Sequence, residues 1–246
     1  MNQYEKFYQL HQQQAPFIIA NAWNARSAQL IEEAGFEAIA TSSGAIAGSL
    51  GYEDGEKIPF NELLYMVQRI KACTTLPLSV DMERGYADDL NVLTDNIQKL
   101  IDNGVSGINI EDMQGEDIYL RKLESIKNYL IKTNQQLFIN ARTDVFLQKL
   151  PSPLETVLRR AKLYKEAGAD GLFVPAVSDA TVIKEITRST TLPVNMVASS
   201  KLSVETLASL GIRRISMAVL LYKATYNQLA RISRNIKDEN SFSPLF

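Results

Sequence analysis

Acidic side chains follow three of the short apolar runs in this sequence, close to where the runs end. Asp81 and Glu83 close one run, Glu111 closes the next, and Asp54 lies in a glycine-containing loop after an earlier run. Carboxylates that face one another repel unless a cation or a shared proton lies between them. Mg2+ prefers oxygen ligands and needs only one or two protein carboxylates, because it keeps several waters. The four acids therefore predict a site for Mg2+ or Mn2+; the competing interpretation is that they cap helices or are solvated loop charges.

An arginine and a small-residue loop are candidates for binding an anion. Arg142 shares a strand face with Asn140, and its guanidinium can grip a carboxylate or a phosphonate through two parallel hydrogen bonds. The alternative is an ion pair with one of the acids. The loop at 41–45 reads Thr-Ser-Ser-Gly-Ala, and its amides could approach an anion, although Ser-Gly joints are also common turns. Trp23 either walls the pocket or packs on the first helix, and Asn195 either contacts substrate or satisfies backbone groups.

The scarcest residue types exclude several kinds of chemistry. The chain has one cysteine, Cys73, and one histidine, His11, so it can form neither an internal disulfide nor a zinc site of Cys and His. His11 lies in a glutamine-rich segment near the N-terminus, where we expect it to pack within a leading helix. With 26 basic and 28 acidic residues and no basic stripe, the sequence argues against a nucleic-acid partner or an anionic membrane surface. The polar N-terminus has no signal-peptide core, which predicts a cytoplasmic protein.

These candidates lie at the joints of one repeated pattern, an apolar run followed by a segment with helical spacing. The predicted strands are 17–20, 37–41, 77–83, 107–111, 137–142, 171–174, 193–197 and 213–219. The predicted helices are 4–14, 25–35, 60–73, 90–103, 119–132, 153–167, 179–188, 203–210 and 220–236. Eight such pairs predict a single (β/α)8 TIM barrel over 1–246 with a leading helix, and an open doubly wound sheet is the alternative. In a barrel the chemistry lies at the C-terminal ends of the strands.

The motifs together resemble the isocitrate lyase and phosphoenolpyruvate mutase superfamily, and most closely its short bacterial members. The resemblance covers roughly residues 5 to 200. Its matching stretches are Asn21-Ala22-Trp23 with Ser27-Ala28, Thr41-Ser42-Ser43, Leu50-Gly51-Tyr52 with Asp54-Gly55, Asp81 with Glu83-Gly85-Tyr86, Gly107-Ile108-Asn109-Ile110-Glu111-Asp112, Asn140-Ala141-Arg142-Thr143-Asp144 and Ala167-Gly168-Ala169-Asp170-Gly171. Each stretch alone is weak, but the set in this order is specific.

The resemblance implies a Mg2+-dependent site for a 2-oxo acid or an enolpyruvate-like ligand. Asp81 would bind the metal directly, and Asp54, Glu83 and Glu111 would reach it largely through water. It also implies a homo-tetramer or dimer in which the last helix, 220–236, is exchanged between subunits.

The resemblance further implies how the substrate is bound. Ser43, next to Ser42 and with the amides of Gly44 and Ala45, would hold the carboxylate or oxo oxygen. Arg142 would clamp an anionic group.

The loop after the fourth strand departs from the family pattern. It reads Met113-Gln114-Gly115-Glu116-Asp117-Ile118-Tyr119, without the cysteine of the lyase members or the lysine and asparagine of the mutase and hydrolase members. Pro175 stands where the mutase has a histidine. Arg84 stands where we expect a small residue, and it would partly neutralise the carboxylates.

These departures leave three functions open. The first is Mg2+-assisted cleavage beside a 2-oxo group, such as decarboxylation or hydrolysis of oxaloacetate to a pyruvate enolate, with water or Tyr52 as the proton donor. The second is a C–C lyase acting on a larger substituted malate. The third is a 2-oxo acid binding protein without catalysis.

Overall fold

Eight short parallel strands pair in sequence order, and the last pairs with the first, so that the sheet closes into a barrel. The computed structural model describes all residues, 1–246. The strands are β1 (Phe17–Ala22), β2 (Ile39–Thr41), β3 (Leu78–Asp81), β4 (Gly107–Glu111), β5 (Phe138–Arg142), β6 (Gly171–Phe173), β7 (Val194–Val197) and β8 (Arg214–Ser216). This closure confirms the predicted barrel and excludes the open sheet.

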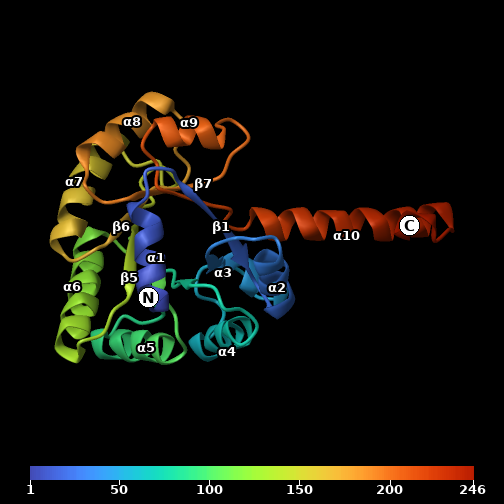
Figure 1. The fold of residues 1–246 in the computed structure, drawn as a ribbon, viewed down its shortest axis with the longest axis horizontal. Coiled ribbons are helices and arrows are strands. Elements are labelled where there is room, and N and C mark those ends of the chain that lie inside the picture. Colours follow the sequence, from blue (N-terminus) through green and yellow to red (C-terminus); the bar gives the residue numbers. More distant parts are fainter.

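Helices surround the barrel and follow its strands along the chain (Figure 1). They are α1 (Gln3–Gln12), α2 (Ala25–Glu33), α3 (Ser43–Ser49), α4 (Phe60–Lys71), α5 (Leu90–Asp102), α6 (Glu116–Thr133), α7 (Pro153–Glu166), α8 (Ala180–Ser189), α9 (Val204–Ser209) and α10 (Leu220–Glu239). None of these helices is both long enough and apolar enough to cross a membrane.

Two of the differences from the sequence prediction lie at strand ends that matter for chemistry. The segment expected to be a loop after β2 is the helix α3, because Ser42 caps its N-terminus by accepting a hydrogen bond from the amide of Ala45 at 3.4 Å. β3 ends at Asp81 rather than Glu83, because Glu83 has a left-handed φ of 46° and turns the chain out of the sheet.

The leading helix α1 lies across one end of the barrel (Figure 1) and packs an aromatic cluster against it. Phe7 of α1 contacts the rings of Phe17 and Phe138 edge-on. His11 stacks on Phe138 and its Nδ1 lies 2.8 Å from the carbonyl of Phe7. Burial lowers the pKa of His11 to about 3, with the charge of Arg214 adding to the effect. His11 is therefore an uncharged packing residue at the end opposite the predicted chemistry.

The barrel interior carries a layer of polar side chains beneath the C-terminal strand ends. Asn140 donates a hydrogen bond to Asn109 Oδ1 at 2.9 Å, and Arg214 Nη2 lies 3.4 Å from the same oxygen. Arg214 is fully buried, and its Nε and Nη1 have no hydrogen-bond partner. Burial lowers its pKa to about 9, and the negative charge of Asp81 acts in the opposite sense. Arg214, which interacts electrostatically with Asp81, thus lies buried beneath the strand ends.

Candidate active site

A cavity of about 750 Å3 opens at the C-terminal ends of the strands, as a barrel of this kind requires. Six of the residues predicted for the site line it: Ser42, Ser43, Gly44, Asp54, Asp81 and Arg142. The two remaining acids, Glu83 and Glu111, do not line the cavity, but their carboxylates interact electrostatically with Asp81. The four acids named from the sequence therefore gather around one strand end, that of β3.

Asp81 is held in place by three hydrogen bonds with residues of the β2–α3 joint, two accepted and one donated. Its Oδ2 accepts from the Ser43 hydroxyl at 2.9 Å and from the Ser43 amide at 3.3 Å. Its own amide donates to Thr41 Oγ1 at 2.9 Å. No hydrogen bond within the protein reaches Oδ1, so one oxygen of Asp81 is fixed and the other remains available to a ligand. The Ser43 hydroxyl and amide are accordingly committed to Asp81 rather than to a substrate oxygen.

Asp54 approaches the start of α3 at a glycine. A Cβ added to Gly44 would lie 2.9 Å from Asp54 Oδ2 and 3.1 Å from its Cγ, closer than side-chain atoms normally approach. Gly44 thus makes the space in which the Asp54 carboxylate stands. The sequence predicted an amide role for this glycine, and the structure adds this steric role.

Glu83 is a buried carboxylate with a single hydrogen-bond donor. Tyr86 donates its hydroxyl hydrogen to Glu83 Oε1 at 2.8 Å. Burial raises the pKa of Glu83 to about 7, and the charges of Asp81 and Asp54 raise it further against the effect of Tyr86. Glu83 also adopts a left-handed backbone, which costs roughly 1–2 kcal/mol for a residue with a Cβ. Strain and burial at one residue are typical of a functional site.

Arg142 at the end of β5 stands between two carboxylates. Its Nη1 lies 2.8 Å from Glu111 Oε2, and its Nε lies 2.8 Å from Asp144 Oδ1. Burial raises the pKa of Glu111 to about 8; Arg142 opposes this shift and Asp81 adds to it. Nη2 has no hydrogen-bond acceptor in the protein, and Arg142 lines the cavity. The ion pair and the anion-binding role predicted for this arginine are therefore compatible, because they use different nitrogens.

The donor atoms at this site fit a hard divalent cation that keeps most of its water. The side chains offer only oxygen, and Asp81 Oδ1 has no protein partner. No three acidic, histidine or cysteine side chains are arranged to hold an ion directly. Mg2+ commonly binds through one or two carboxylates and several waters, so a single direct ligand is sufficient. The residues therefore fit Mg2+ bound at Asp81 with the other acids reached through water.

Besides Glu83 and Glu111, four residues predicted for the site do not line this cavity. Ala45 is buried, and its amide donates to Ser42 Oγ at 3.4 Å within the cap of α3. Trp23 lines a second, apolar cavity between α2 and α10, where its ring packs edge-on against Tyr222. Tyr52 donates its hydroxyl hydrogen to Glu62 Oε1 at 3.0 Å. Asn195 is buried within the barrel, and neither atom of its amide has a partner. Asn195 lies beside Arg214 in the register of β7 and β8, so it belongs to the polar layer beneath the cavity.

Arg84 does not neutralise the four acids in the way the sequence suggested. Its Nη2 pairs with Glu56 Oε2 at 3.0 Å, and its amide donates to Glu56 Oε1 at 2.8 Å. Lys122 of α6, which the sequence reasoning missed, donates to the carbonyl of Arg84 at 2.7 Å and to Gln114 Oε1 at 2.6 Å. It thereby joins the loops that follow β3 and β4. The one signal was its place on the apolar face of a predicted helix, one turn after Tyr119.

Two more basic residues line the cavity without having been predicted. Lys201 lies in the β7–α9 loop and Lys223 near the start of α10, and neither makes an ion pair. With Arg142 they give the cavity three cationic side chains. No sequence signal marked them, because exposed lysines occur throughout the chain.

The chain is similar to known proteins over most of its length. The phosphoenolpyruvate phosphomutase family model matches residues 7–237. An uncharacterized protein of Mycobacterium tuberculosis is 33% identical over 94% of this chain and 89% of its own length. An oxaloacetate decarboxylase of Pseudomonas fluorescens is 30% identical over 85% of this chain and 78% of its own, and a 2-methylisocitrate lyase of Halalkalibacterium halodurans is 28% identical over 96% and 83%.

A solved structure shares the fold across nearly the whole chain. An oxaloacetate acetylhydrolase in complex with oxalate superposes with a TM-score of 0.88, covering 98% of this chain and 89% of its own, at 18% identity. The family match over residues 7–237 and the similarity to enzymes of this superfamily lead to the same conclusion. The chain belongs to the phosphoenolpyruvate phosphomutase family, within the isocitrate lyase and phosphoenolpyruvate mutase superfamily of lyases and mutases.

Proposed function

We propose that this protein is a Mg2+-dependent enzyme that cleaves the bond next to the 2-oxo group of a small acid, with oxaloacetate as the first candidate substrate. One observation carries the proposal: Asp81 and Arg142 line a single cavity, and neither Asp81 Oδ1 nor Arg142 Nη2 has a hydrogen-bond partner in the protein. The first is an acceptor suited to a metal, and the second is a donor suited to a carboxylate. The similarity to an oxaloacetate decarboxylase supports the choice of substrate.

The residues divide the work between binding and orientation. A bound Mg2+ would act as a Lewis acid on the 2-oxo acid and would favour the charge that develops during cleavage. Asp81 would hold the ion directly, while Asp54, Glu83 and Glu111 would bind its waters. Arg142 orients the substrate carboxylate through Nη2. Ser43 keeps Asp81 in a single orientation, since it occupies the second carboxylate oxygen.

The proton that completes the reaction comes from water rather than from Tyr52. Cleavage of oxaloacetate releases carbon dioxide and leaves an electron pair at C3, which must take up a proton to give pyruvate. The Tyr52 hydroxyl is bonded to Glu62 and does not line the cavity. The cavity is open to solvent, so water can reach C3 directly.

The test is the metal-dependent turnover of oxaloacetate above its spontaneous rate. Added Mg2+ should accelerate loss of oxaloacetate and formation of pyruvate in the wild type, and Asp81→Ala should abolish that gain. Asp102→Ala is the matched control, because Asp102 is an exposed acid at the end of α5 that bonds only to Gln98. No metal-dependent gain on any 2-oxo acid, together with tight binding of oxalate, would identify a binding protein instead.

The size of the cavity favours a second candidate, a C–C lyase on a larger substituted malate. Its volume of about 750 Å3 lies within the roughly 300–1,000 Å3 of sites that enclose drug-sized ligands. Lys201 and Lys223 on its wall could receive a further carboxylate of such a substrate. Product analysis separates the candidates, since a lyase releases a second carbonyl compound beside the 2-oxo acid. The 2-methylisocitrate lyase relative supports this alternative.

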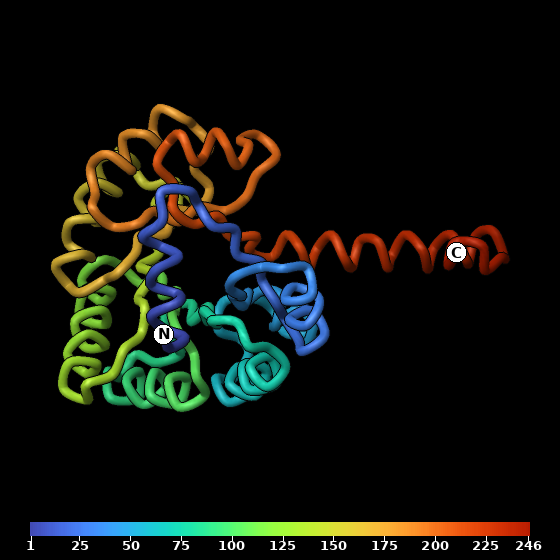
Figure 2. Tube along the Cα trace, in the orientation of Figure 1, coloured from blue at the N-terminus to red at the C-terminus, as the bar shows by residue number.

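We further propose a homo-oligomer that covers α10. This helix runs away from the barrel (Figures 1 and 2), and none of its residues is buried. Leu229 is exposed on it and faces the apolar cavity of about 570 Å3 that Leu30 and Phe36 also line. A second copy of the chain would cover this surface. Light scattering should give the mass of a dimer or tetramer. Deletion of residues 220–246 should lower the number of subunits in the assembly.

A further inference from the structure

The direction in which Arg142 points depends on the two carboxylates beside it. Nη1 pairs with Glu111 and Nε with Asp144, each at 2.8 Å, which leaves Nη2 as the one guanidinium nitrogen without a protein partner in a residue that lines the cavity. The guanidinium is planar, so fixing Nε and Nη1 fixes the direction of Nη2. A shift of either carboxylate would therefore turn the one nitrogen that is available to a ligand.

The Asp144 carboxylate has no side-chain partner other than Arg142. The residue is fully buried in the turn after β5, and its second oxygen, Oδ2, has no hydrogen-bond partner. Burial raises the pKa of Asp144, which reflects the cost of keeping this carboxylate charged away from water. Its backbone amide, however, donates to Asp112 Oδ1 at 2.9 Å. Asp112 therefore fixes the backbone from which the Asp144 carboxylate reaches Arg142.

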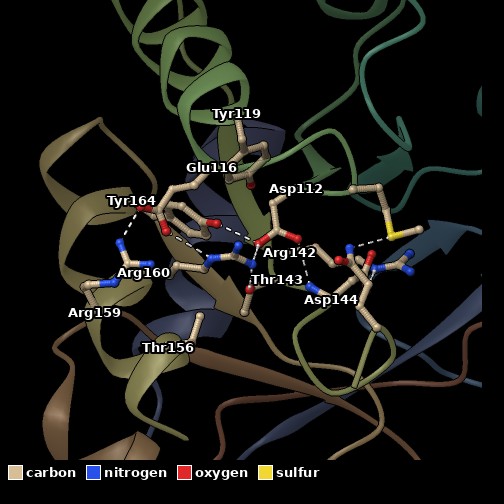
Figure 3. Close-up of polar contacts among 12 residues, drawn as sticks. Asp112, Glu116, Tyr119, Arg142, Thr143, Asp144, Thr156, Arg159, Arg160 and Tyr164 are labelled. Carbon is tan, nitrogen blue, oxygen red and sulfur yellow. Dashed lines mark hydrogen bonds and ion pairs between the residues drawn. The ribbon is translucent and has the colours of Figure 1, made fainter. Parts of the chain in front are cut away.

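Asp112 is itself clamped by α7, as Figure 3 shows. Its Oδ2 accepts hydrogen bonds from Arg160 Nη1 and from the Tyr164 hydroxyl, both at 2.6 Å. The two donors are four residues apart and so lie on one face of the helix. Arg160 Nη1 also donates to Thr143 Oγ1 at 3.2 Å, which adds a second attachment to the β5 turn. The chain of contacts thus runs from α7 through Asp112 to Asp144 and Arg142.

In this series of contacts, Arg142 alone lines the cavity. Asp112, Arg160 and Tyr164 are all buried, and none lines it. A buried ion pair contributes little net stability, since removing two charges from water offsets their attraction. What the pair does supply is a fixed position for the Asp112 carboxylate.

We propose that Asp112, clamped by Arg160 and Tyr164 of α7, is a positioning residue that sets the direction of Arg142 through Asp144. The effect on catalysis rests on the proposed function, in which Arg142 orients a carboxylate. The effect on Arg142 itself does not, because it is a property of the protein without substrate. The two effects are therefore measured separately.

The kinetic measurement compares Asp112→Asn, Tyr164→Phe and the matched control Arg159→Met. The amide of Asp112→Asn turns a donor toward Arg160, so kcat/KM for oxaloacetate should fall by about 10–100-fold, as a misplacement of about 1 Å can cause. Tyr164→Phe removes one hydroxyl and should cause a fall of a few fold. Arg159 lies next in the helix and pairs with Glu116 rather than with Asp112. Glu116 also binds Arg160 Nε at 3.1 Å, but the bond from Arg160 Nη1 to Asp112 does not involve Arg159, so replacing Arg159 should leave kcat/KM unchanged.

A double-mutant cycle separates positioning from a general structural effect. Arg142→Lys removes the planar fork, so adding Asp112→Asn to it should lower kcat/KM no further. Effects that multiply would overturn the proposal. Should Asp112→Asn fail to fold, Tyr164→Phe in the same cycle gives the answer, since it removes one oxygen and no volume of the ring.

The second measurement needs neither substrate nor metal. The Nε–H signal of Arg142 can be assigned by NMR from its loss in Arg142→Lys, and the bond to Asp144 should slow its exchange with water. Exchange should become at least about tenfold faster in Asp112→Asn and stay unchanged in Arg159→Met, since a tenfold change corresponds to about 1.4 kcal/mol of protection. Unchanged exchange in a folded Asp112→Asn protein would contradict the proposal. If the wild type turns over no 2-oxo acid, the proposed function fails while this result still decides the positioning role.

Discussion

Ser43 donates both its hydroxyl and its amide hydrogen to the same oxygen of Asp81, at 2.9 and 3.3 Å. These bonds join the start of α3, which follows β2, to the end of β3, and β2 and β3 are neighbours in the barrel. The hydroxyl bond can be removed alone, whereas the amide bond belongs to the backbone. Mutation of residues that orient a metal ligand in this way commonly lowers metal affinity or activity by roughly 10–100-fold.

Ser43→Ala should weaken Mg2+ activation without unfolding the protein. The Asp81 carboxylate keeps only its longer bond and can rotate, so the Mg2+ concentration for half-maximal activity should rise by about 10-fold. Titration of the rate with Mg2+ measures this. Ser49→Ala is the control, because Ser49 lies on the same helix but bonds to the carbonyl of Ile46. Equal Mg2+ requirements in the two variants would contradict the role given to Ser43.

Arg142→Lys should impair substrate binding although it keeps the charge. Lysine cannot bond to Glu111, Asp144 and a ligand in the plane that the guanidinium provides. We expect kcat/KM for oxaloacetate to fall by about 100-fold, as happens when one well-placed donor to a reacting anion is lost. Steady-state kinetics measures the change. Arg213→Lys, which replaces an arginine that bonds to the carbonyl of Gln14, should keep wild-type kinetics.

Gly44→Ala should separate activity from stability. Gly44 has a helical backbone, so alanine is accepted there and can stabilise α3 by about 0.5–1 kcal/mol. The new methyl group would, however, displace the Asp54 carboxylate, which lies 2.9 Å from its position. We expect the melting temperature to change by a few degrees at most and Mg2+-dependent turnover to fall by about 10-fold.

The control for this substitution lies on the same helix. A Cβ at Gly48 would lie 3.0 Å from the Tyr222 hydroxyl, away from the four acids. Gly48→Ala should therefore leave the Mg2+ requirement unchanged. A Gly44→Ala protein with full activity would show that Asp54 has no part in the reaction.

The metal-free protein should lose stability as the pH rises above neutrality. The pKa values of Glu83 and Glu111 are raised to about 7 and about 8 from an ordinary 4.5, so the folded chain holds protons that the unfolded chain has released. This stabilisation is complete below pH 4.5 and is lost as the pH passes through the folded pKa values. His11, whose pKa is lowered, affects stability only below its ordinary 6.5.

Thermal unfolding between about pH 6.5 and about pH 8.5 measures the effect, since these limits lie above the histidine range and across both glutamate pKa values. The melting temperature should fall over this range and should fall less in Glu83→Gln, which is neutral at every pH. Added Mg2+ should raise the melting temperature more at the higher pH, because it binds the ionised carboxylates. A Glu83→Gln protein that loses as much stability as the wild type would contradict this account.

Several residues of this site could be predicted from the order of residue types along the sequence. The alternation of apolar runs with helical segments predicted the barrel, and the barrel brings the ends of its strands to one side. Asp54, Asp81 and Arg142 were therefore expected to meet, and they do line one cavity. The same logic misplaced Tyr52, because a loop residue close in sequence to the site can direct its side chain elsewhere. Helical spacing likewise gave no indication that the loop after Ser42 would begin α3.

The sequence by itself limited the kind of chemistry, because with one histidine and one cysteine the polar groups that remain are carboxylates, arginine, lysine, tyrosine, serine and backbone amides. Only the tertiary structure decided which atoms are free to act. Arg160 lies 48 positions from Asp112 and Ser43 lies 38 from Asp81, yet these pairs fix the orientation of the site. A hydrogen bond depends on distance and direction in space, and residues so far apart in the chain acquire these only when the helices pack on the barrel.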